Sequence, residues 1–162
     1  MVNACLEIET TRDIAHQIVR HRSFAFQEFS QRYANPEEQG DMFEYSEARL
    51  QDTKNRQNSI ETSDVGLQSW WDAQQKYVAE ISKKIYDEAL EKGIAKEQAR
   101  KVLPEGLTKT KLYMNGSLRS WIHYIELRSA NGTQKEHMEI AHACAKVIAG
   151  IFPLMSELQQ GE

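Results

Sequence analysis

The sequence has few of the residues that mark cross-linked, metal-binding or membrane proteins. Its 162 residues include only two cysteines, three prolines and eight glycines. Cys5 and Cys144 are too few and too far apart for a CxxC or zinc signature, so we expect reduced, packed thiols and no metal site; counting alone leaves a disulfide open. No apolar run approaches the roughly 18 residues that span a bilayer, and no basic segment precedes an apolar stretch at the start. We therefore expect a cytoplasmic protein without a membrane partner.

The sequence also lacks an excess of positive charge. It has 20 lysines and arginines against 24 aspartates and glutamates, which gives a net charge of −4. A protein that coats nucleic acid normally has a global basic excess, so we expect no nucleic-acid partner. Binding through a basic loop is the remaining alternative, and it would require an affinity that falls steeply with salt. Any anion-binding site must therefore be local.

Hydrophobic periodicity predicts an α+β protein, mostly helical with a small mixed or antiparallel sheet, in one domain over residues 1–162. Residues 2–9 alternate like a half-buried strand, and their strand partner is expected far downstream, at residues 108–116. Helices are expected from Thr10 or Thr11 to about Arg22, from Leu67 to Gly93, over 96–104 and 117–128, and from a capping box at 133–136 to Pro153. Residues 35–64 read as a long polar loop, functional or disordered.

A cluster of cations stands out near the start of the chain. Arg20, His21, Arg22 and Arg32 surround a single glutamate, Glu28. Arginines repel one another unless they share an anion, and each offers a planar fork of donors that matches phosphate or carboxylate. From the residues alone, Glu28 could pair with one arginine, and a phosphate ligand could bind the others. A set of solvated surface charges is the alternative.

The cluster also resembles a family signature, that of the flavin-dependent thymidylate synthases: Arg-His-Arg, a short spacer, then Asn-Glu, one residue, Ser, one residue, Arg-Tyr. The matching residues are Arg20, His21, Arg22, Glu28, Ser30, Arg32 and Tyr33. Two positions depart from the pattern. Ala25 stands where the family often has serine, which removes a hydroxyl, and Gln27 stands where it often has asparagine, which keeps an amide.

Further motifs carry the same resemblance in the same order along the chain. Residues 98–104, QARKVLP, are similar to the family's arginine before Leu-Pro, and residues 116–128, GSLRSWIHYIELR, are similar to its helix ending in Leu-Arg. Residues 133–141, TQKEHMEIA, fit the helix that follows. The resemblance therefore covers about residues 2 to 153.

The resemblance implies an activity and an assembly. Family members are homotetramers that bind FAD between subunits and convert dUMP to dTMP, with methylenetetrahydrofolate as carbon donor and NADPH as reductant. They also carry a further N-terminal segment with a helix and a turn near Phe-Glu-His that helps hold FAD, and this chain begins where that segment ends. The chain is then a fragment, is completed by a separate polypeptide, or has a start codon assigned too late. A non-catalytic nucleotide-binding or subunit-interaction fragment is the alternative function.

The resemblance also implies site residues. The dUMP-binding residues would be Gln17, Ile18, Val19, Arg20, Glu28, Phe29, Ser30, Gln31, Arg32, Arg100 and Arg128. The FAD-binding residues would be Arg20, His21, Arg22, Glu28, Ser117, Arg119 and His123. Arg128 matches the arginine that activates the uracil ring, and a guanidinium there would stabilise charge developing on the pyrimidine. Ser30 has no evident general base beside it, so we assign it to binding rather than to nucleophilic attack.

Some of these residues also have ordinary structural interpretations. Arg100 and Arg119 could be surface charges on helices, and His123 a helix histidine with a satisfied partner. Trp70, Trp71 and Trp121 fall on apolar stripes, so we expect core or subunit-interface residues rather than residues that stack on a flavin.

Overall fold

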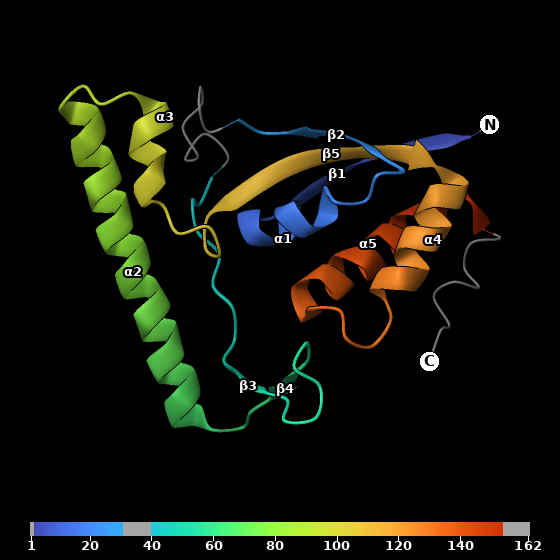
Figure 1. Cartoon of the computed structure of the whole chain (residues 1–162), viewed down its shortest axis with the longest axis horizontal. Helices are drawn as coiled ribbons and strands as arrows, with labels where there is room; N and C mark the ends of the chain where they lie inside the picture. The colour runs from blue at the N-terminus through green and yellow to red at the C-terminus, as the bar shows by residue number, and fades with distance from the viewer. Residues whose placement is uncertain (1, 31–39, 154–162) are drawn as a thin grey trace.

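A three-stranded antiparallel sheet lies at the centre of the computed structural model, which describes residues 2–30 and 40–153 (Figure 1). Its strands are β1 (Asn3–Thr11), β5 (Lys109–Ser117) and β2 (Ala25–Glu28), in the order β1-β5-β2. β1 and β5 pair from Asn3 with Ser117 to Thr11 with Lys109. The predicted strand at the start and its distant partner are therefore confirmed, and β2, which showed no clear period in the sequence, is an addition.

Helices cover one face of this sheet: α1 (Arg12–Ile18), α4 (Leu118–Arg128) and α5 (Lys135–Ile151) (Figure 1). The alternation of β1 and β5 points one side chain in two at these helices, so Ile8, Leu112 and Met114 are buried while their strand neighbours face solvent. Trp121 of α4 is fully buried in the same cluster. The α+β prediction is confirmed.

The first helix is shorter than the sequence predicts. α1 ends at Ile18, not near Arg22, and the amide of His21 donates to the carbonyl of Ile18 in a turn. The chain leaves the helix here because Phe24 is buried in the core and Ala25 starts the strand that pairs with β5. The Arg-His-Arg motif therefore lies on a turn between α1 and β2.

A long helix, α2 (Val65–Glu91), stands beside the sheet with α3 (Lys96–Ala99) and the 3₁₀ turn η2 (Arg100–Val102) (Figure 1). Its N-terminus is capped by Asp64, and Gly93 follows its C-terminus at a φ of 79°, a conformation that favours glycine. Tyr86 and Ala99 pack with Met42 in a second, smaller cluster. The helix and its glycine stop are confirmed, whereas one domain over residues 1–162 stays a prediction.

The face that α2 buries is not the one its apolar residues predict. Its buried residues are Gln75, Ala79, Ser82 and Tyr86. The apolar stripe is exposed instead, with Trp70 57%, Tyr77 61%, Ile81 40% and Ile85 45% accessible. Trp70 and Trp71 are therefore not core residues of this chain, since the polar face of α2 is the one that turns inwards, and their place at a subunit interface stays a prediction. Trp121 is a core residue as expected.

The segment before α2 has more structure than the predicted loop. Residues 40–64 contain a hairpin of β3 (Arg49–Gln51) and β4 (Ser59–Glu61). The side-chain amide of Gln68 bonds both backbone groups of Ala48, and Arg49 forms an ion pair with Glu136 of α5. The prediction of an irregular loop is therefore wrong for this part; residues 35–39 lie outside the described residues.

The same ion pair explains why the predicted capping box does not form. α5 begins at Lys135 with Gln134 as its N-cap, and no side chain caps it. Glu136, which would complete the box with Thr133, instead reaches Arg49 of the hairpin. A tertiary ion pair has replaced a local cap.

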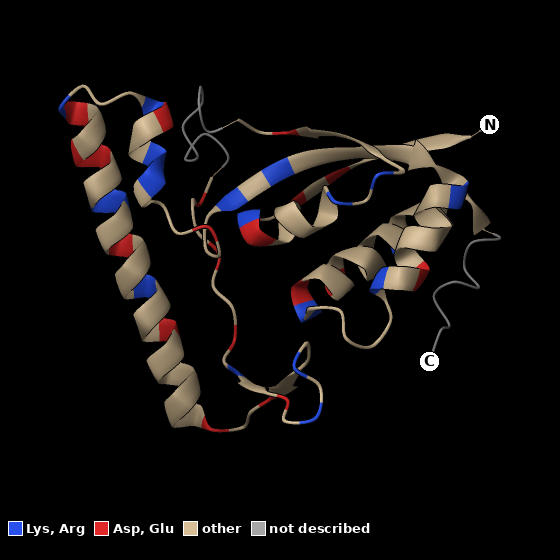
Figure 2. Cartoon of the chain, viewed as in Figure 1, with Lys and Arg blue, Asp and Glu red and all other residues tan. Residues whose placement is uncertain are grey.

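Both cysteines are free thiols, so the prediction of reduced thiols is confirmed. Cys144 is buried as expected, but Cys5 is exposed because it lies on the solvent face of β1. In the described ranges, no helix is both long and apolar enough to cross a membrane. Figure 2 shows charges of both signs on each described α-helix.

Candidate active site

A cavity of about 400 Å³ brings three of the predicted site residues together. It is lined by Asp13, His16 and Gln17 of α1, Arg20 of the following turn, Glu105, and Arg128 at the end of α4. Gln17, Arg20 and Arg128 are separated by up to about 110 positions in sequence, and the packing of α1 against the α4–α5 layer places them around one space. The cavity therefore combines two guanidinium groups and an amide with an imidazole and two carboxyl groups.

The guanidinium of Arg128 is held by His21. Arg128 Nε donates to His21 Nε2 over 2.9 Å, and the His21 ring makes an edge contact with Tyr124 at 4.9 Å between centroids. Partial burial, together with the nearby Arg128 and His123, lowers the pKa of His21 to about 4, so the ring is neutral and accepts this bond. Because Nε is used, the two Nη groups of Arg128 remain as a fork of donors for a ligand.

His137 and Gln134 hold the side-chain amide of Gln17 by hydrogen bonds. His137 Nδ1 lies 3.3 Å from Gln17 Oε1, and His137 Nε2 lies 3.1 Å from the Tyr124 hydroxyl. Gln17 Nε2 donates to Gln134 Oε1 over 2.7 Å. Burial lowers the pKa of His137 to about 4, with Arg128 and His21 adding to the shift, and burial raises the pKa of the Tyr124 phenol. Both groups are therefore neutral hydrogen-bonding partners near pH 7.

We expect these two histidines to make the protein sensitive to acid. A histidine ordinarily titrates near 6.5, and both pKa values fall to about 4 in the folded chain. Between these pH values the unfolded chain binds more protons than the folded one, so the free energy of unfolding decreases as pH falls from about 6.5 to about 4. Urea titrations across this range should give a shallower decrease for His21→Gln than for the wild type. Parallel profiles for the two proteins would contradict this assignment.

Two other cations of the motif, Arg20 and Arg22, are accessible to solvent. Arg20 and Arg22 are exposed on the turn, and within the described ranges neither forms an ion pair. Arg20 shares its cavity with the carboxylates of Asp13 and Glu105, and both guanidinium groups are accessible to an anionic ligand. Glu28, which the sequence places as their possible anchor, instead lies 3.5 Å from Arg12 and accepts from the Thr110 hydroxyl over 3.0 Å. Arg12 was missed because it lies outside the motif.

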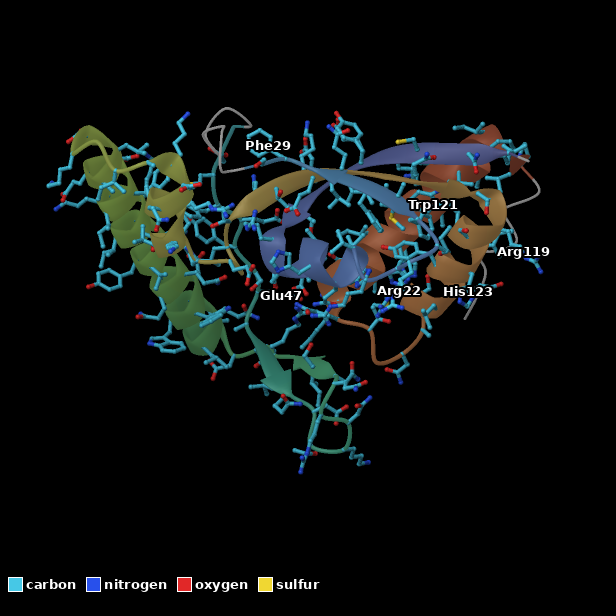
Figure 3. All side chains as sticks on the ribbon, turned by 45° about the horizontal axis from the view of Figure 1, so that its top comes forward. Arg22, Phe29, Glu47, Arg119, Trp121 and His123 are labelled. Carbon is cyan, nitrogen blue, oxygen red and sulfur yellow. The ribbon has the colours of Figure 1, made fainter. Side chains whose placement is uncertain are left out.

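The other predicted dUMP residues are not in the Arg128 cavity. Arg100 lines a separate cavity of about 250 Å³ with Arg12, Lys101 and Leu103, and Glu105 lines both cavities. Phe29 follows the end of β2, well apart from Arg22 (Figure 3). Ser30 is exposed, and Gln31 and Arg32 lie outside the described residues. One chain therefore presents the predicted dUMP site in two parts.

Two neighbours of Gln17 differ in what they can offer a ligand. Val19 is 37% exposed, but Ile18 is completely buried in the core cluster. A ligand contact at Ile18 is therefore restricted to its backbone, since the side chain is not accessible.

The predicted flavin residues of α4 lie near its N-terminal end. The Ser117 hydroxyl caps the helix by accepting from the amide of Ser120 over 3.2 Å. Arg119 and His123 are exposed four residues apart, and Arg119 projects outwards (Figure 3). These two side chains are accessible to a ligand, while Ser117 already has a structural role.

Sequence reasoning missed the supporting residues Tyr124, Gln134 and His137. The sequence places each on a predicted helix or at its start, with no spacing that distinguishes it from an ordinary helix residue. Gln134 and His137 contact Gln17 across 117 and 120 positions, and Tyr124 contacts His21 from a different helix. A polar residue on the buried face of an amphipathic helix, as His137 is, was the available signal.

The fold and the cavity together define an α+β protein with two arginines, an amide and two carboxyl groups around one cavity. The sequence profile of the family described as "Thymidylate synthase complementing protein" matches residues 1–154. The chain belongs to this family, the flavin-dependent thymidylate synthases, which are methyltransferases.

Two relatives have similar sequences over most of the chain. The flavin-dependent thymidylate synthase of Synechocystis is 53% identical over 156 residues, which are 96% of this chain and 70% of the relative. A probable flavin-dependent thymidylate synthase of Paramecium bursaria Chlorella virus 1 is 51% identical over 152 residues, which are 94% of this chain and 68% of the relative. The resemblance drawn from the motifs is therefore confirmed.

A solved structure has the same fold. The crystal structure of a UMP/dUMP methylase from Streptomyces cacaoi bound with 5-Br dUMP matches with a TM-score of 0.77. The match covers 96% of this chain and 70% of the other, at 22% sequence identity. At this identity the likeness concerns the fold.

Proposed function

We propose that this chain converts dUMP to dTMP, with FAD as cofactor, methylenetetrahydrofolate as carbon donor and NADPH as reductant. Family membership supports the reaction type. The observation that carries the proposal is the cavity in which His21 holds Arg128 beside Gln17 and Arg20. These groups suit a nucleotide, since they offer charge for the phosphate and directional hydrogen bonds for the base.

In this proposal Arg128 acts on the uracil ring. The Nη fork would lie against the pyrimidine edge and stabilise the negative charge that develops as the ring carbon reacts. No thiol is needed for this activation. Burial raises the pKa of Cys144 to about 12, so it is a poor nucleophile, and Cys5 lies on β1, apart from the cavity.

The exposed cations would bind the phosphates. Arg20 and Arg22 suit the flavin nucleotide, and Arg119 and His123 are accessible on α4 for the same ligand. Arg20 also lines the nucleotide cavity, and Arg100 would bind the dUMP phosphate. When bound, FAD supplies the reducing chemistry that completes the methyl group.

A homotetramer would complete the site. The family resemblance implies this assembly; Arg100 and Arg128 line neighbouring cavities that share Glu105, and this arrangement does not by itself require a second chain. The exposed apolar stripe of α2 offers a surface for this contact, because exposed apolar patches on one helix face mark association sites.

We expect the α2 stripe to control association. Ile81→Asp should weaken self-association roughly 100-fold, since placing an unpaired charge in an apolar interface costs about 3 kcal/mol. Sedimentation velocity over a concentration series would measure this, with Lys84→Glu as the control because Lys84 is exposed on the same helix and already charged. An Ile81→Asp protein with the wild-type sedimentation profile would contradict the interface.

The proposed function is tested by flavin retention and turnover. The purified chain is incubated with FAD, desalted and scanned in the visible range, and dTMP formation is then assayed with all three substrates. Flavin bands with dTMP formation are the expected result. A colourless chain that still binds dUMP would favour the non-catalytic nucleotide-binding alternative, and failure to bind dUMP would overturn both.

A further inference from the structure

We propose that His137 is a positioning residue that fixes the amide of Gln17 in the nucleotide cavity. The inference rests on the proposed function, because there Gln17 is a dUMP contact. His137 lies on α5, is completely buried, and does not line the cavity itself. Any effect on the nucleotide must therefore pass through Gln17, which lines the cavity and bonds His137.

Each hydrogen bond in the series from Tyr124 through His137 to Gln17 has a defined donor and a defined acceptor. Gln17 Oε1 can only accept, so the His137 nitrogen that faces it, Nδ1, carries the proton. A neutral imidazole then has an acceptor at Nε2, which accepts a hydrogen bond from the Tyr124 hydroxyl. On the far side, Gln17 Nε2 donates to Gln134. This order assigns the oxygen and nitrogen of the Gln17 amide to fixed positions.

A fixed amide has a consequence for the ligand. One N–H and one oxygen lone pair of Gln17 remain after the bonds to Gln134 and His137 are made. They form a donor and an acceptor in known places, which is what recognition of a nucleotide requires. Without His137 only the exposed Gln134 amide opposes rotation of the Gln17 amide, and the two amides can turn together. The donor and acceptor then exchange places, and ligand binding must restore their original positions.

The same buried rings also hold Arg128 in place. The Tyr124 ring packs against the His137 ring at 5.8 Å and against the His21 ring at 4.9 Å between centroids, and His21 bonds Arg128. Gln17 and Arg128 are therefore held from behind by one buried set of rings. The charged or titratable groups that face His137 are Arg128, His21 and Tyr124.

A double-mutant cycle on dUMP affinity tests the inference. Wild type, Gln17→Ala, His137→Phe and the double variant are titrated with dUMP by calorimetry, using the full chain in the presence of FAD. We expect about a tenfold loss for each single variant, as for one hydrogen bond at a site. The double variant should bind no worse than Gln17→Ala, because His137 acts through Gln17. Additive losses, typical of a general packing effect, would overturn the inference.

A matched pair of variants gives a second readout that packing alone does not move. The amide nitrogen of His137→Asn lies near the position of Nδ1, so this variant can still donate to Gln17. The amide of His137→Gln reaches the position of Nε2 and keeps the contact with Tyr124 instead. We expect His137→Asn to recover most of the dUMP affinity and His137→Gln to recover little. Equal affinities for the two would overturn the inference, even if His137→Phe does not fold.

The experiment separates this inference from the proposed function. If Gln17→Ala weakens dUMP binding while His137→Phe, folded by its thermal transition, binds like wild type, the inference fails and the function stands. If wild type does not bind dUMP, or Gln17→Ala binds it equally well, the assignment of Gln17 fails and the inference with it.

Discussion

Replacing Arg128 with alanine is expected to lower the rate of dTMP formation by about 1,000-fold or more while leaving the chain folded. Removing one group that stabilises transition-state charge typically costs about 10²–10³ in rate, and Arg128 offers a fixed positive charge as well as hydrogen bonds. The side chain is only partly buried, at the end of α4, so its loss removes little core packing. Steady-state kinetics with saturating dUMP, alongside circular dichroism, would measure both effects.

A lysine at the same position sharpens this test. Arg128→Lys keeps a positive charge, but a single ammonium group cannot bond His21 and also present a planar fork to the pyrimidine. We expect activity between those of the wild type and the alanine variant, with the greater part of the loss remaining. Substantial dTMP formation by Arg128→Ala would exclude the role given to Arg128, and a fully active lysine variant would exclude the role of the fork.

The fold was predictable from sequence where periodicity and burial agree. β1 and β5 alternate apolar and polar residues, and each alternation survives in the structure because one sheet face is covered by helices. α2 shows where this logic fails. Its apolar residues are periodic, but Gln68 and Gln75 use the inner face to bond the backbone of residues 46–48, so the stripe is left outside. Periodicity identifies a helix, and tertiary hydrogen bonds decide which face turns inwards.

Only the part of the candidate site that lies in a sequence motif was predictable. A motif keeps neighbouring residues such as Arg20, His21 and Arg22 together in sequence, so a resemblance can find them. The supports of the site come from distant segments: His137 is 120 positions from Gln17, and Arg128 is 107 from His21. Periodicity is a local signal and carries no information about such contacts. The turn that presents Arg20 and Arg22 was placed in a helix, because nothing local marks its start.

Trp121→Ala is the substitution expected to destabilise the chain most. Trp121 is fully buried, and its ring meets Phe24 edge-on at 4.9 Å between centroids. Its indole Nε1 also donates to the carbonyl of Ala4 over 3.1 Å, which ties α4 to β1. Truncating a buried tryptophan to alanine costs about 3–5 kcal/mol, a large part of the roughly 5–15 kcal/mol that stabilises a typical domain. Urea unfolding would measure the difference.

Trp70→Ala provides the contrast for this prediction. Trp70 is 57% exposed on α2, so at concentrations where the chain is monomeric its loss should change the free energy of unfolding by about 0.5 kcal/mol or less. A Trp121→Ala protein within 1 kcal/mol of the wild type would contradict the core assignment. Because α4 carries both Trp121 and Arg128, Trp121→Ala should also lower activity, but in proportion to the unfolded fraction. Arg128→Ala should lower the activity of protein that remains folded. The two variants on α4 therefore distinguish a loss of stability from a loss of catalysis.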